Sequence, residues 1–292
     1  MSAQDFSLDD RVAVVTGAGK GLGRAWALHL ASLGARVVVN NRISGGRQAT
    51  RSADAVVAAI RLAGGEAVAN YDSVEESDAG AGLVELALQH YGQLDIIVAN
   101  AGIDRACSFH NQGMAEFDEI MQVNFFAVAR LLHAAWPLMR EQQYGRILVS
   151  GSSAGCYGNH GQAAYSSSKA ALQGLVKTLS IEGASRNVLV NALAPYAVTQ
   201  LTDSAFPAEQ VAQFAPEAVS RLVGWLVSEK CRLTGKTFIA GAEHARLVAT
   251  LESDTLSLGG DISTAVSQLV DAPCRFSPAS AIAEFEDFRA SF

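Results

Sequence analysis

The sequence predicts an α/β protein built on a single doubly wound parallel sheet of about seven strands, flanked by helices and followed by a C-terminal arm. Three observations predict this class. Short β-branched runs alternate with helix-like segments of about 10 to 15 residues, the pattern of right-handed β-α-β units. The first run leads directly into a cluster of glycines. The chain has 292 residues, enough to bury one large core, and α/β folds of this size are often a single domain.

Each expected strand is a short, mostly aliphatic run, as is typical of strands buried on both faces. These strands are Val12–Thr16, Arg36–Asn40, Ala67–Tyr71, Leu94–Ala99, Arg146–Ser150, Val188–Leu193 and Thr237–Ala240. The expected helices lie between them, and the first two end at glycines, which are common just past a helix C-terminus. These helices are Leu22–Leu33, Ser52–Ala63, Ser77–His90, the long periodic segment Met114–Gln142, and Tyr165–Glu182.

The same alternation defines the expected domains. Residues 1–251 form one dinucleotide-binding and catalytic domain, without an internal repeat or a Pro/Gly linker. Residues 252–292 break the alternation with glycines and prolines, and predict an appended arm with a short helix near Ser280–Phe288. The apolar content of this arm favours docking onto the domain or onto a partner subunit over a free tail.

Composition excludes several classes of function. Hydrophobic residues make up 49% of the chain and charged residues 17%, so the chain is not disordered. Lys and Arg number 22 against 29 Asp and Glu, and this net charge of −7 argues against a nucleic-acid partner. The four cysteines and six histidines lack metal-ligand spacing, so we expect no metal site and free thiols in a reducing compartment.

The chain shows no export or membrane segment. Met1–Asp10 is acidic and lacks the apolar core of a signal peptide. The longest apolar helix candidate, Val123–Met139, is too short and too polar to span a bilayer. We therefore expect a cytoplasmic protein without a membrane partner.

A glycine-rich turn follows the first expected strand and leads into the first expected helix. Backbone without side chains lets a pyrophosphate approach the positive end of that helix, which predicts a Rossmann-type dinucleotide site. The glycines read G-x-x-x-G-x-G, because a leucine takes the place of the third glycine of G-x-G-x-x-G. The expected contacts in this turn are Gly17, Gly19, Lys20, Gly21, Leu22 and Gly23.

The end of the second expected strand selects the adenosine ribose. A site for NAD normally presents a carboxylate there, but this chain has Asn41 followed by Arg42. Arg42 is suited to bind a 2′-phosphate, with Lys20 as a second cation. We therefore expect NADP(H) to be preferred, with NAD(H) as the alternative; a solvated Arg42 without a role is the competing interpretation.

Tyr165 and Lys169 lie one helical turn apart and predict proton-transfer chemistry. An ammonium beside a phenol is expected to lower its pKa toward working pH, so that the phenol exchanges a proton with a carbonyl or alcohol oxygen. Ser152, just after a strand, is placed to donate to that oxygen. Asn124 lies inside a helix, where a short polar side chain needs a bound water or a backbone kink.

These motifs, in this order, resemble the short-chain dehydrogenase/reductase family over Arg11 to about Ala240. The resemblance implies that Asn124, Ser152, Tyr165 and Lys169 form the catalytic tetrad, and that Tyr165 and Lys169 also contact the nicotinamide nucleotide. It further implies that Asp72 holds the adenine amine and that Asn100 braces the central strands. Further cofactor contacts implied are Ser73, Ala101, Gly102, Pro195 and Val198. The family's usual Pro-Gly after the sixth strand is Pro195-Tyr196 here.

Within the family, the chain most resembles the (3R)-hydroxyacyl-CoA dehydrogenase domains of multifunctional β-oxidation enzymes. Four stretches carry the likeness: Gly65–Glu76, Tyr144–Arg146, Gly155–Gln162 and Ser180–Gly183. Two features differ: we expect no hydratase domain in this chain, and Asn41 stands where those dehydrogenases carry a carboxylate.

The expected function is that of an NADP(H)-dependent oxidoreductase interconverting a ketone and a secondary alcohol, with a 3-oxoacyl/3-hydroxyacyl thioester as the suggested substrate. Two alternatives stay open: reduction of an imine or another C=N bond, and a non-catalytic nucleotide-sensing protein. We expect a homodimer or homotetramer. The loop Ala194–Ala215 should cover the substrate, with Thr199, Thr202 and Phe206 facing cofactor or ligand. His160 is expected to fill the substrate loop, with a second proton donor as the alternative.

Overall fold

The computed structural model describes residues 6–43, 51–199, 207–257, 261–276 and 279–290. The chain divides into two compact units, residues 1–247 and 248–292, where the sequence predicted a boundary between 251 and 252.

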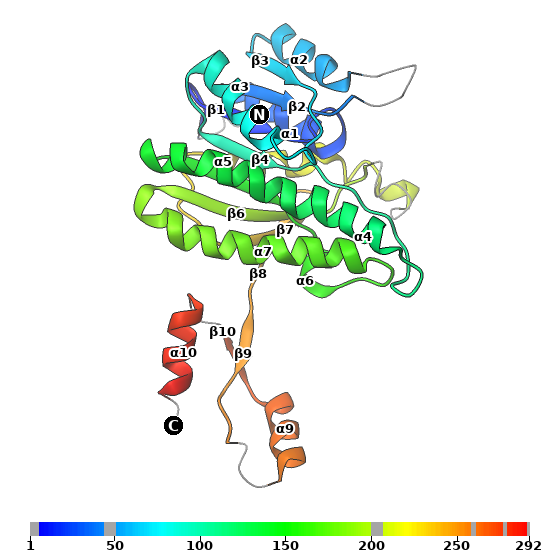
Figure 1. The fold of residues 1–292 in the computed structure, drawn as a ribbon, viewed down its shortest axis with the longest axis vertical. Helices are drawn as coiled ribbons and strands as arrows, with labels where there is room; N and C mark the ends of the chain where they lie inside the picture. Colours follow the sequence, from blue (N-terminus) through cyan, green and yellow to red (C-terminus); the bar gives the residue numbers. More distant parts are fainter. Residues whose placement is uncertain (1–5, 44–50, 200–206, 258–260, 277–278, 291–292) are drawn as a thin grey trace. The chain divides into compact units, whose positions relative to one another are not determined.

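The first unit is built on one eight-stranded sheet with the order β3-β2-β1-β4-β5-β6-β7-β8 (Figure 1). The six pairings from β3 to β7 are all parallel. The chain moves outward from β1 to β3, returns to β4 beside β1, and then moves outward on the other side, which confirms the doubly wound α/β class. The strands are β1 (Val12–Val15), β2 (Arg36–Asn40), β3 (Ala67–Asn70), β4 (Ile96–Ala99), β5 (Gly145–Ser150), β6 (Val188–Pro195), β7 (Thr237–Gly241) and β8 (His244–Val248).

The eighth strand corrects the expected count of about seven. β8 follows β7 through the two-residue turn Ala242-Glu243, and both residues have positive φ angles, of 49° and 61°. A two-residue turn with both φ angles positive joins antiparallel strands. Asn-Gly or Asp-Gly is the usual sequence of such a turn, so Ala-Glu carried no hairpin signal.

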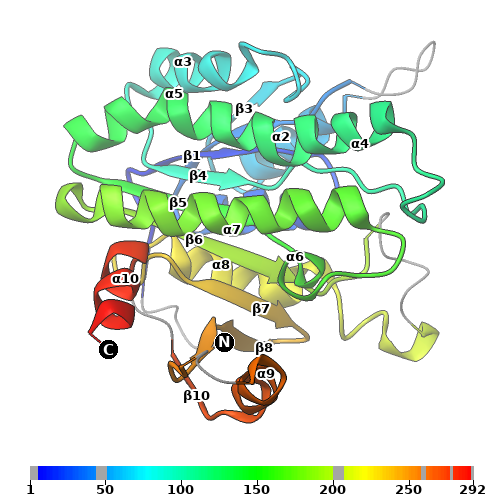
Figure 2. The ribbon, with the colours of Figure 1, turned by 60° about the horizontal axis from the view of Figure 1, so that its bottom comes forward.

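Helices cover both faces of the sheet (Figure 2). Alternate residues of β1 explain this: Val12 and Val14 belong to the core on one face, and Ala13 and Val15 to the core on the other. The first face carries α3 (Ala79–Tyr91), α5 (Ala127–Glu141) and α7 (Ala163–Gly183), and the second carries α1 (Gly21–Ser32), α2 (Ser52–Leu62) and α8 (Ser220–Leu226).

The long helix expected over Met114–Gln142 contains a change of helical geometry. The chain forms α4 (Met114–Met121), then a π-helical turn (Gln122–Phe126), and continues as α5. Single π-helical turns are frequent at functional sites. Asn124 lies in the middle of this turn, so of the two explanations given for its position the structure supports the backbone kink.

One short helix that the sequence did not predict lies beside α7. α6 (Ser153–Tyr157) begins directly after β5, and the Ser152 hydroxyl caps it by accepting a hydrogen bond of 3.1 Å from Ala154 N. At five residues, α6 is too short to show a hydrophobic period.

The second unit contains more regular structure than the single helix predicted for the C-terminal arm. β9 (Leu251–Ser253) pairs antiparallel with β10 (Cys274–Phe276), and α9 (Ile262–Asp271) and α10 (Ala281–Arg289) are its helices. Short polar side chains cap both helices, which the sequence analysis overlooked: Asp261 accepts from Thr264 N and Ser280 from Ala283 N. Docking of this unit stays a prediction.

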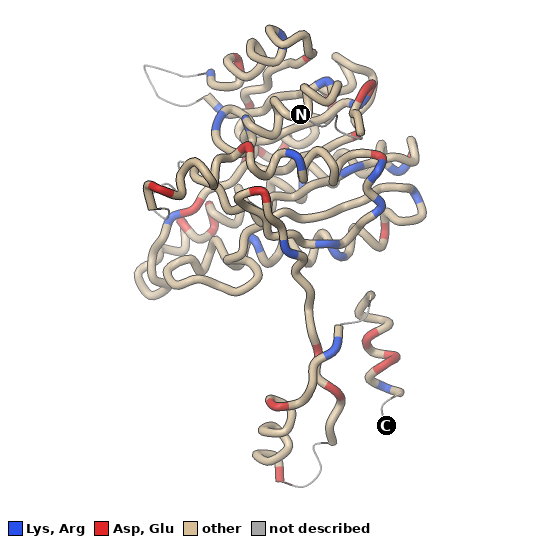
Figure 3. The backbone as a smooth tube through the Cα atoms, turned by 180° about the vertical axis from the view of Figure 1, so that it is seen from behind, with Lys and Arg blue, Asp and Glu red and all other residues tan. Residues whose placement is uncertain are grey.

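Basic and acidic residues are interspersed along the described chain (Figure 3). Within the described residues, no helix is both long enough and apolar enough to cross a membrane.

Candidate active site

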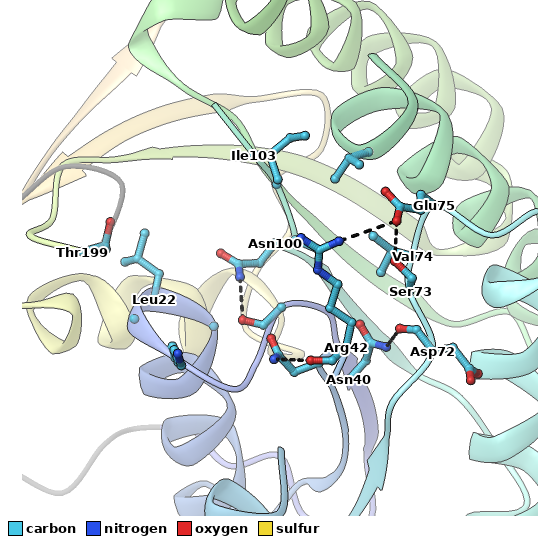
Figure 4. A pocket seen from close by; sticks show the side chains of 18 of the residues that line it. Leu22, Asn40, Arg42, Asp72, Ser73, Val74, Glu75, Asn100, Ile103 and Thr199 are labelled. Atoms are coloured by element: carbon cyan, nitrogen blue, oxygen red, sulfur yellow. Dashed lines mark hydrogen bonds and ion pairs between the residues drawn. The ribbon is translucent and has the colours of Figure 1, made fainter. Parts of the chain in front are cut away.

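A cavity of about 370 Å³ lies at the carboxyl ends of β1, β2, β3 and β4 (Figure 4). Twelve of the residues expected to bind the nucleotide line it: Gly17, Lys20, Gly21, Leu22, Gly23, Asn41, Arg42, Asp72, Ser73, Asn100, Ala101 and Gly102. The expected contacts that do not line it are Gly19, Tyr165, Lys169, Pro195 and Val198, whereas Thr199 does line it. Thr202 and Phe206 lie outside the described residues.

The glycines of the first loop serve two different purposes. Gly17 and Gly21 have positive φ angles of 62° and 52°, which residues with a Cβ rarely adopt. Gly19 instead lies against the protein itself, because a Cβ there would be 2.2 Å from Ser52 Oγ and 2.7 Å from Asn41 Cγ. A side chain at this position would therefore collide with the protein, and the expected contact of Gly19 with the nucleotide stays a prediction.

The N-terminus of α1 faces this loop without a side-chain cap. Lys20 is the N-cap residue, and its side chain makes no capping hydrogen bond. The first backbone N–H groups of a helix lack intrahelical partners and carry partial positive charge. Such an end is suited to a phosphate.

Asn100 joins the ends of the two central strands. Its Nδ2 donates to Thr16 O at 3.0 Å, and Thr16 Oγ1 accepts from the backbone N–H groups of Asn100 and Ala101 at 3.0 and 3.1 Å. This reciprocal pairing holds the loop after β4 against the loop after β1. The geometry matches the bracing role that the family resemblance implies.

The loops after β2 and β3 are also joined by amide side chains. The buried Asn40 donates through Nδ2 to Asn70 Oδ1 at 2.7 Å and to Asp72 O at 3.0 Å. Asp72 Oδ2 accepts from Asn70 Nδ2 at 2.8 Å. The pocket edge that carries Asp72 is therefore held rigidly to β2.

Asn124 is completely buried and is hydrogen-bonded by protein groups. Its Oδ1 accepts from Ile103 N at 2.8 Å, and its Nδ2 donates to Ile103 O at 2.9 Å and to Ser168 Oγ at 3.1 Å. One amide thus connects the π-helical turn, the loop after β4 and helix α7.

Lys169 lies beneath the pocket, only 3% exposed. Its Nζ donates to Ser150 O at 2.8 Å and lies 5.7 Å from the centroid of the Tyr165 ring. A Cβ on Gly102 would be 3.5 Å from this Nζ and 3.2 Å from Asn124 Oδ1. Glycine at this position therefore brings the pocket wall against both side chains.

The ionisation of Tyr165 and Lys169 corrects one expectation. Burial raises the pKa of Tyr165, Ser152 acts to lower it, and Asp104 adds to the rise. Lys169 is not among the groups that shift the pKa of Tyr165, so the expected net lowering is not found. Burial lowers the pKa of Lys169 from 10.5 to about 8, and Asp104 partly opposes this.

Two residues beside the tetrad, Asp104 and Gln162, were missed by the sequence analysis. The Gln162 amide donates a hydrogen bond to the Asp104 carboxylate, and Cys107 N donates to Gly161 O at 2.7 Å, which joins the loop after β4 to the loop before α7. Asp104 directly follows the Asn-Ala-Gly-Ile segment, and that position was a usable signal. His160 is exposed to solvent, and its expected place in the substrate loop stays a prediction.

Six further pocket residues were missed: Asn40, Val74, Glu75, Ile103, Glu119 and Val123. Glu75 and Ile103 lie within two residues of expected contacts, so extending each loop would have included them. Glu119 comes from α4, and only the tertiary structure brings it to the pocket. The described part of the chain contains no group of three or more His, Cys, Asp or Glu placed to hold a metal ion.

The chain is similar to dehydrogenases across most of its length. It is 43% identical over 251 residues to a short-chain type dehydrogenase/reductase of Mycobacterium tuberculosis, covering 85% of this chain and 87% of that protein. It is 45% identical over 243 residues to the peroxisomal multifunctional enzyme type 2 of Mus musculus, covering 82% of this chain but only 33% of that enzyme. The chain therefore corresponds to about a third of the mouse protein.

A solved structure and a family model agree with these relatives. The crystal structure of a short chain dehydrogenase from Mycobacterium avium superposes with a TM-score of 0.83 at 35% identity, covering 94% of this chain and 99% of that one. The sequence model of the short chain dehydrogenase family matches residues 11–210 of this chain. These findings confirm the family resemblance. The chain belongs to the short-chain dehydrogenase/reductase family, whose members are oxidoreductases that act on hydroxyl/carbonyl pairs with NAD or NADP.

Proposed function

We propose that the protein is an NADP(H)-dependent oxidoreductase that interconverts a ketone and a secondary alcohol in a 3-oxoacyl/3-hydroxyacyl thioester. The observation that carries the reaction is the placement of Lys169, whose Nζ lies under Gly102 of the pocket wall and near the Tyr165 ring. A proton-transferring pair therefore adjoins the cavity proposed for the nucleotide.

The residues of the cavity fit a dinucleotide. The uncapped N-terminus of α1 suits the pyrophosphate, and Asp72 suits the adenine amine. Arg42 suits a 2′-phosphate, because a guanidinium binds phosphate with charge-assisted hydrogen bonds and no carboxylate follows β2 directly. When bound, the nicotinamide supplies or accepts the hydride.

The tetrad would handle the substrate oxygen and its proton. Ser152 would donate a hydrogen bond to the oxygen, and Tyr165 would give or take the proton. Lys169 would bind the ribose hydroxyls. Asn124 would act as a positioning residue, since its three hydrogen bonds hold the loop after β4 and helix α7.

The resemblance to (3R)-hydroxyacyl-CoA dehydrogenase domains supports a thioester substrate. We also propose a cytoplasmic homodimer or homotetramer, with residues 252–292 docked on the domain or on a partner subunit. The exposed apolar side chains of α9 support docking, because Ile262, Val266 and Val270 recur every four residues along one helix face.

A thioester substrate should be converted more efficiently than a truncated ketone with the same reacting carbonyl. Binding energy from the remote acyl and thioester groups helps to orient the reacting carbon, which raises kcat/KM. The measurement is kcat/KM for a 3-oxoacyl thioester and for the matching methyl ketone. Equal values for the two compounds would contradict the thioester proposal.

Tyr165→Phe should lower kcat by about 10²- to 10⁴-fold, because it removes the proposed proton donor. Nucleotide affinity should stay close to the wild-type value, since the ring is retained. Steady-state kinetics and a nucleotide titration test both expectations. Tyr157→Phe, at an exposed tyrosine of α6, is the matched control. Retention of most of the kcat by Tyr165→Phe would show that another group transfers the proton.

The buried Lys169 should make stability rise at alkaline pH. Its pKa is lowered from 10.5 to about 8, so between these values the unfolded chain holds a proton that the folded protein does not. The free energy of unfolding of the wild type should rise by about 1.5 kcal/mol relative to Lys169→Met from about pH 8 to about pH 9.5. Denaturant titrations of both proteins measure this difference.

Lys177→Met removes an exposed lysine from the same helix and is the control for this measurement. A wild-type curve parallel to that of Lys169→Met over the same pH range would mean that the Lys169 ammonium is not desolvated.

Arg42→Ala should abolish a preference for NADPH over NADH. Charge-assisted hydrogen bonds of roughly 1.5–3 kcal/mol correspond to a preference of about ten- to a hundredfold. The ratio of kcat/KM with NADPH to kcat/KM with NADH measures this preference. The ratio for Arg42→Lys, which keeps the charge but not the planar guanidinium, should lie between those of the wild type and Arg42→Ala. A wild-type enzyme that prefers NADH, or an unchanged ratio in Arg42→Ala, would contradict the proposal.

A further inference from the structure

Glu75 is a pocket residue whose position is set by its neighbours. It lies in the loop after β3, where its backbone carbonyl accepts from Gln122 Nε2 at 3.1 Å and from Arg130 Nη1 at 3.4 Å. Its Oε1 accepts from Ser73 Oγ at 3.0 Å. The π-helical turn and α5 therefore hold the backbone of Glu75, and Ser73 of the same loop holds its carboxylate at the edge of the pocket.

The carboxylate of Glu75 faces the guanidinium of Arg42 across the pocket (Figure 4). Arg42 Nη1 lies 3.6 Å from Glu75 Oε1, with the two side chains 58% and 35% exposed. This is an ion pair in partial contact with solvent, so it is weak enough to be exchanged for a ligand.

The other two acidic residues of the pocket have different partners. Glu119 binds the Arg105 guanidinium with both carboxylate oxygens, and Asp72 Oδ2 accepts from Asn70 Nδ2 at 2.8 Å. Among the carboxylates that line the described pocket, Glu75 is therefore the one paired with Arg42.

We infer that Glu75 is a specificity-determining residue, which holds Arg42 and thereby weakens its grip on an adenosine 2′-phosphate. This inference rests on the proposed binding of NADP(H) through Arg42. A 2′-phosphate at Arg42 must displace Glu75 or bind beside its negative charge, whereas the 2′-hydroxyl of NAD(H) meets neither obstacle. Glu75 therefore brings the affinities for the two nucleotides closer together.

Glu75 lies in the loop after β3, so the residues at the end of β2 give no sign of its carboxylate. In NAD sites the acidic residue normally ends the second strand and binds the ribose itself. Here that position is Asn41, and the negative charge comes from the loop after β3. From that loop the Glu75 carboxylate acts on the guanidinium of Arg42, the residue after Asn41.

Glu75→Gln should increase the affinity for NADP⁺ relative to NAD⁺ by about two- to tenfold, the range expected for release of an exposed ion pair together with loss of one nearby negative charge. Calorimetric titration of the full chain with each nucleotide measures the ratio without turnover. Titration with 2′,5′-ADP and 5′-AMP isolates the 2′-phosphate, because these fragments differ only in that group. Glu76→Gln, the same change one residue outside the pocket lining, should leave the ratio unchanged.

Combination with Arg42→Ala separates this inference from the proposed cofactor preference. The gain from Glu75→Gln should disappear in the Arg42→Ala background, because Glu75 acts through Arg42. If Glu75→Gln raises the ratio of NADP⁺ to NAD⁺ affinity fully in the Arg42→Ala background, the inference is overturned. It is also overturned if Glu75→Gln leaves the ratio unchanged while Arg42→Ala lowers it. Both outcomes leave the NADP(H) proposal standing. A ratio unaffected by Arg42→Ala would overturn the NADP(H) proposal itself.

Discussion

Parallel pairing of the strands from β3 to β7 is the constraint on which the site depends. Strands that run in one direction place all their carboxyl ends at one edge of the sheet, so the loops that follow them become neighbours. The reversal of strand order between β1 and β4 then opens a crevice at that edge. The loops after β1 to β4 line the cavity, and Ser152 follows β5 and is hydrogen-bonded to Tyr165.

Three amide side chains turn this edge into a rigid frame. Asn100 joins the loops after β1 and β4, Asn40 joins those after β2 and β3, and Asn124 connects the loop after β4 to α7. An amide carries both donor and acceptor groups, so one side chain can satisfy backbone groups of two segments. Loss of any one of them would leave buried polar groups unpaired, which is costly in the low dielectric of the interior.

The charged side chains of the site lie at two depths, one buried and the others near the surface. Lys169 is buried and held by a backbone carbonyl, so its pKa falls to about 8 and its ammonium is placed at a cost in stability. Arg42 and Glu75 lie at the rim, where solvent screens them and partners can exchange. The proposed chemistry thus depends on groups that the fold holds in place, whereas the proposed choice of nucleotide depends on groups that can rearrange.

The sequence by itself determined the alternation of strands and helices, the glycine loop and the order of Asn124, Ser152, Tyr165 and Lys169, because periodicity, backbone freedom and motif spacing are local properties. Only the tertiary structure decided the π-helical turn, the strand after Ala242-Glu243 and the pairing of β9 with β10, since none of them carries a strong local signal. It alone also decided the direction of the Tyr165 pKa shift and the pairing of Arg42 with Glu75. Burial and contacts between residues distant in sequence set both, and neither quantity exists until the chain is folded.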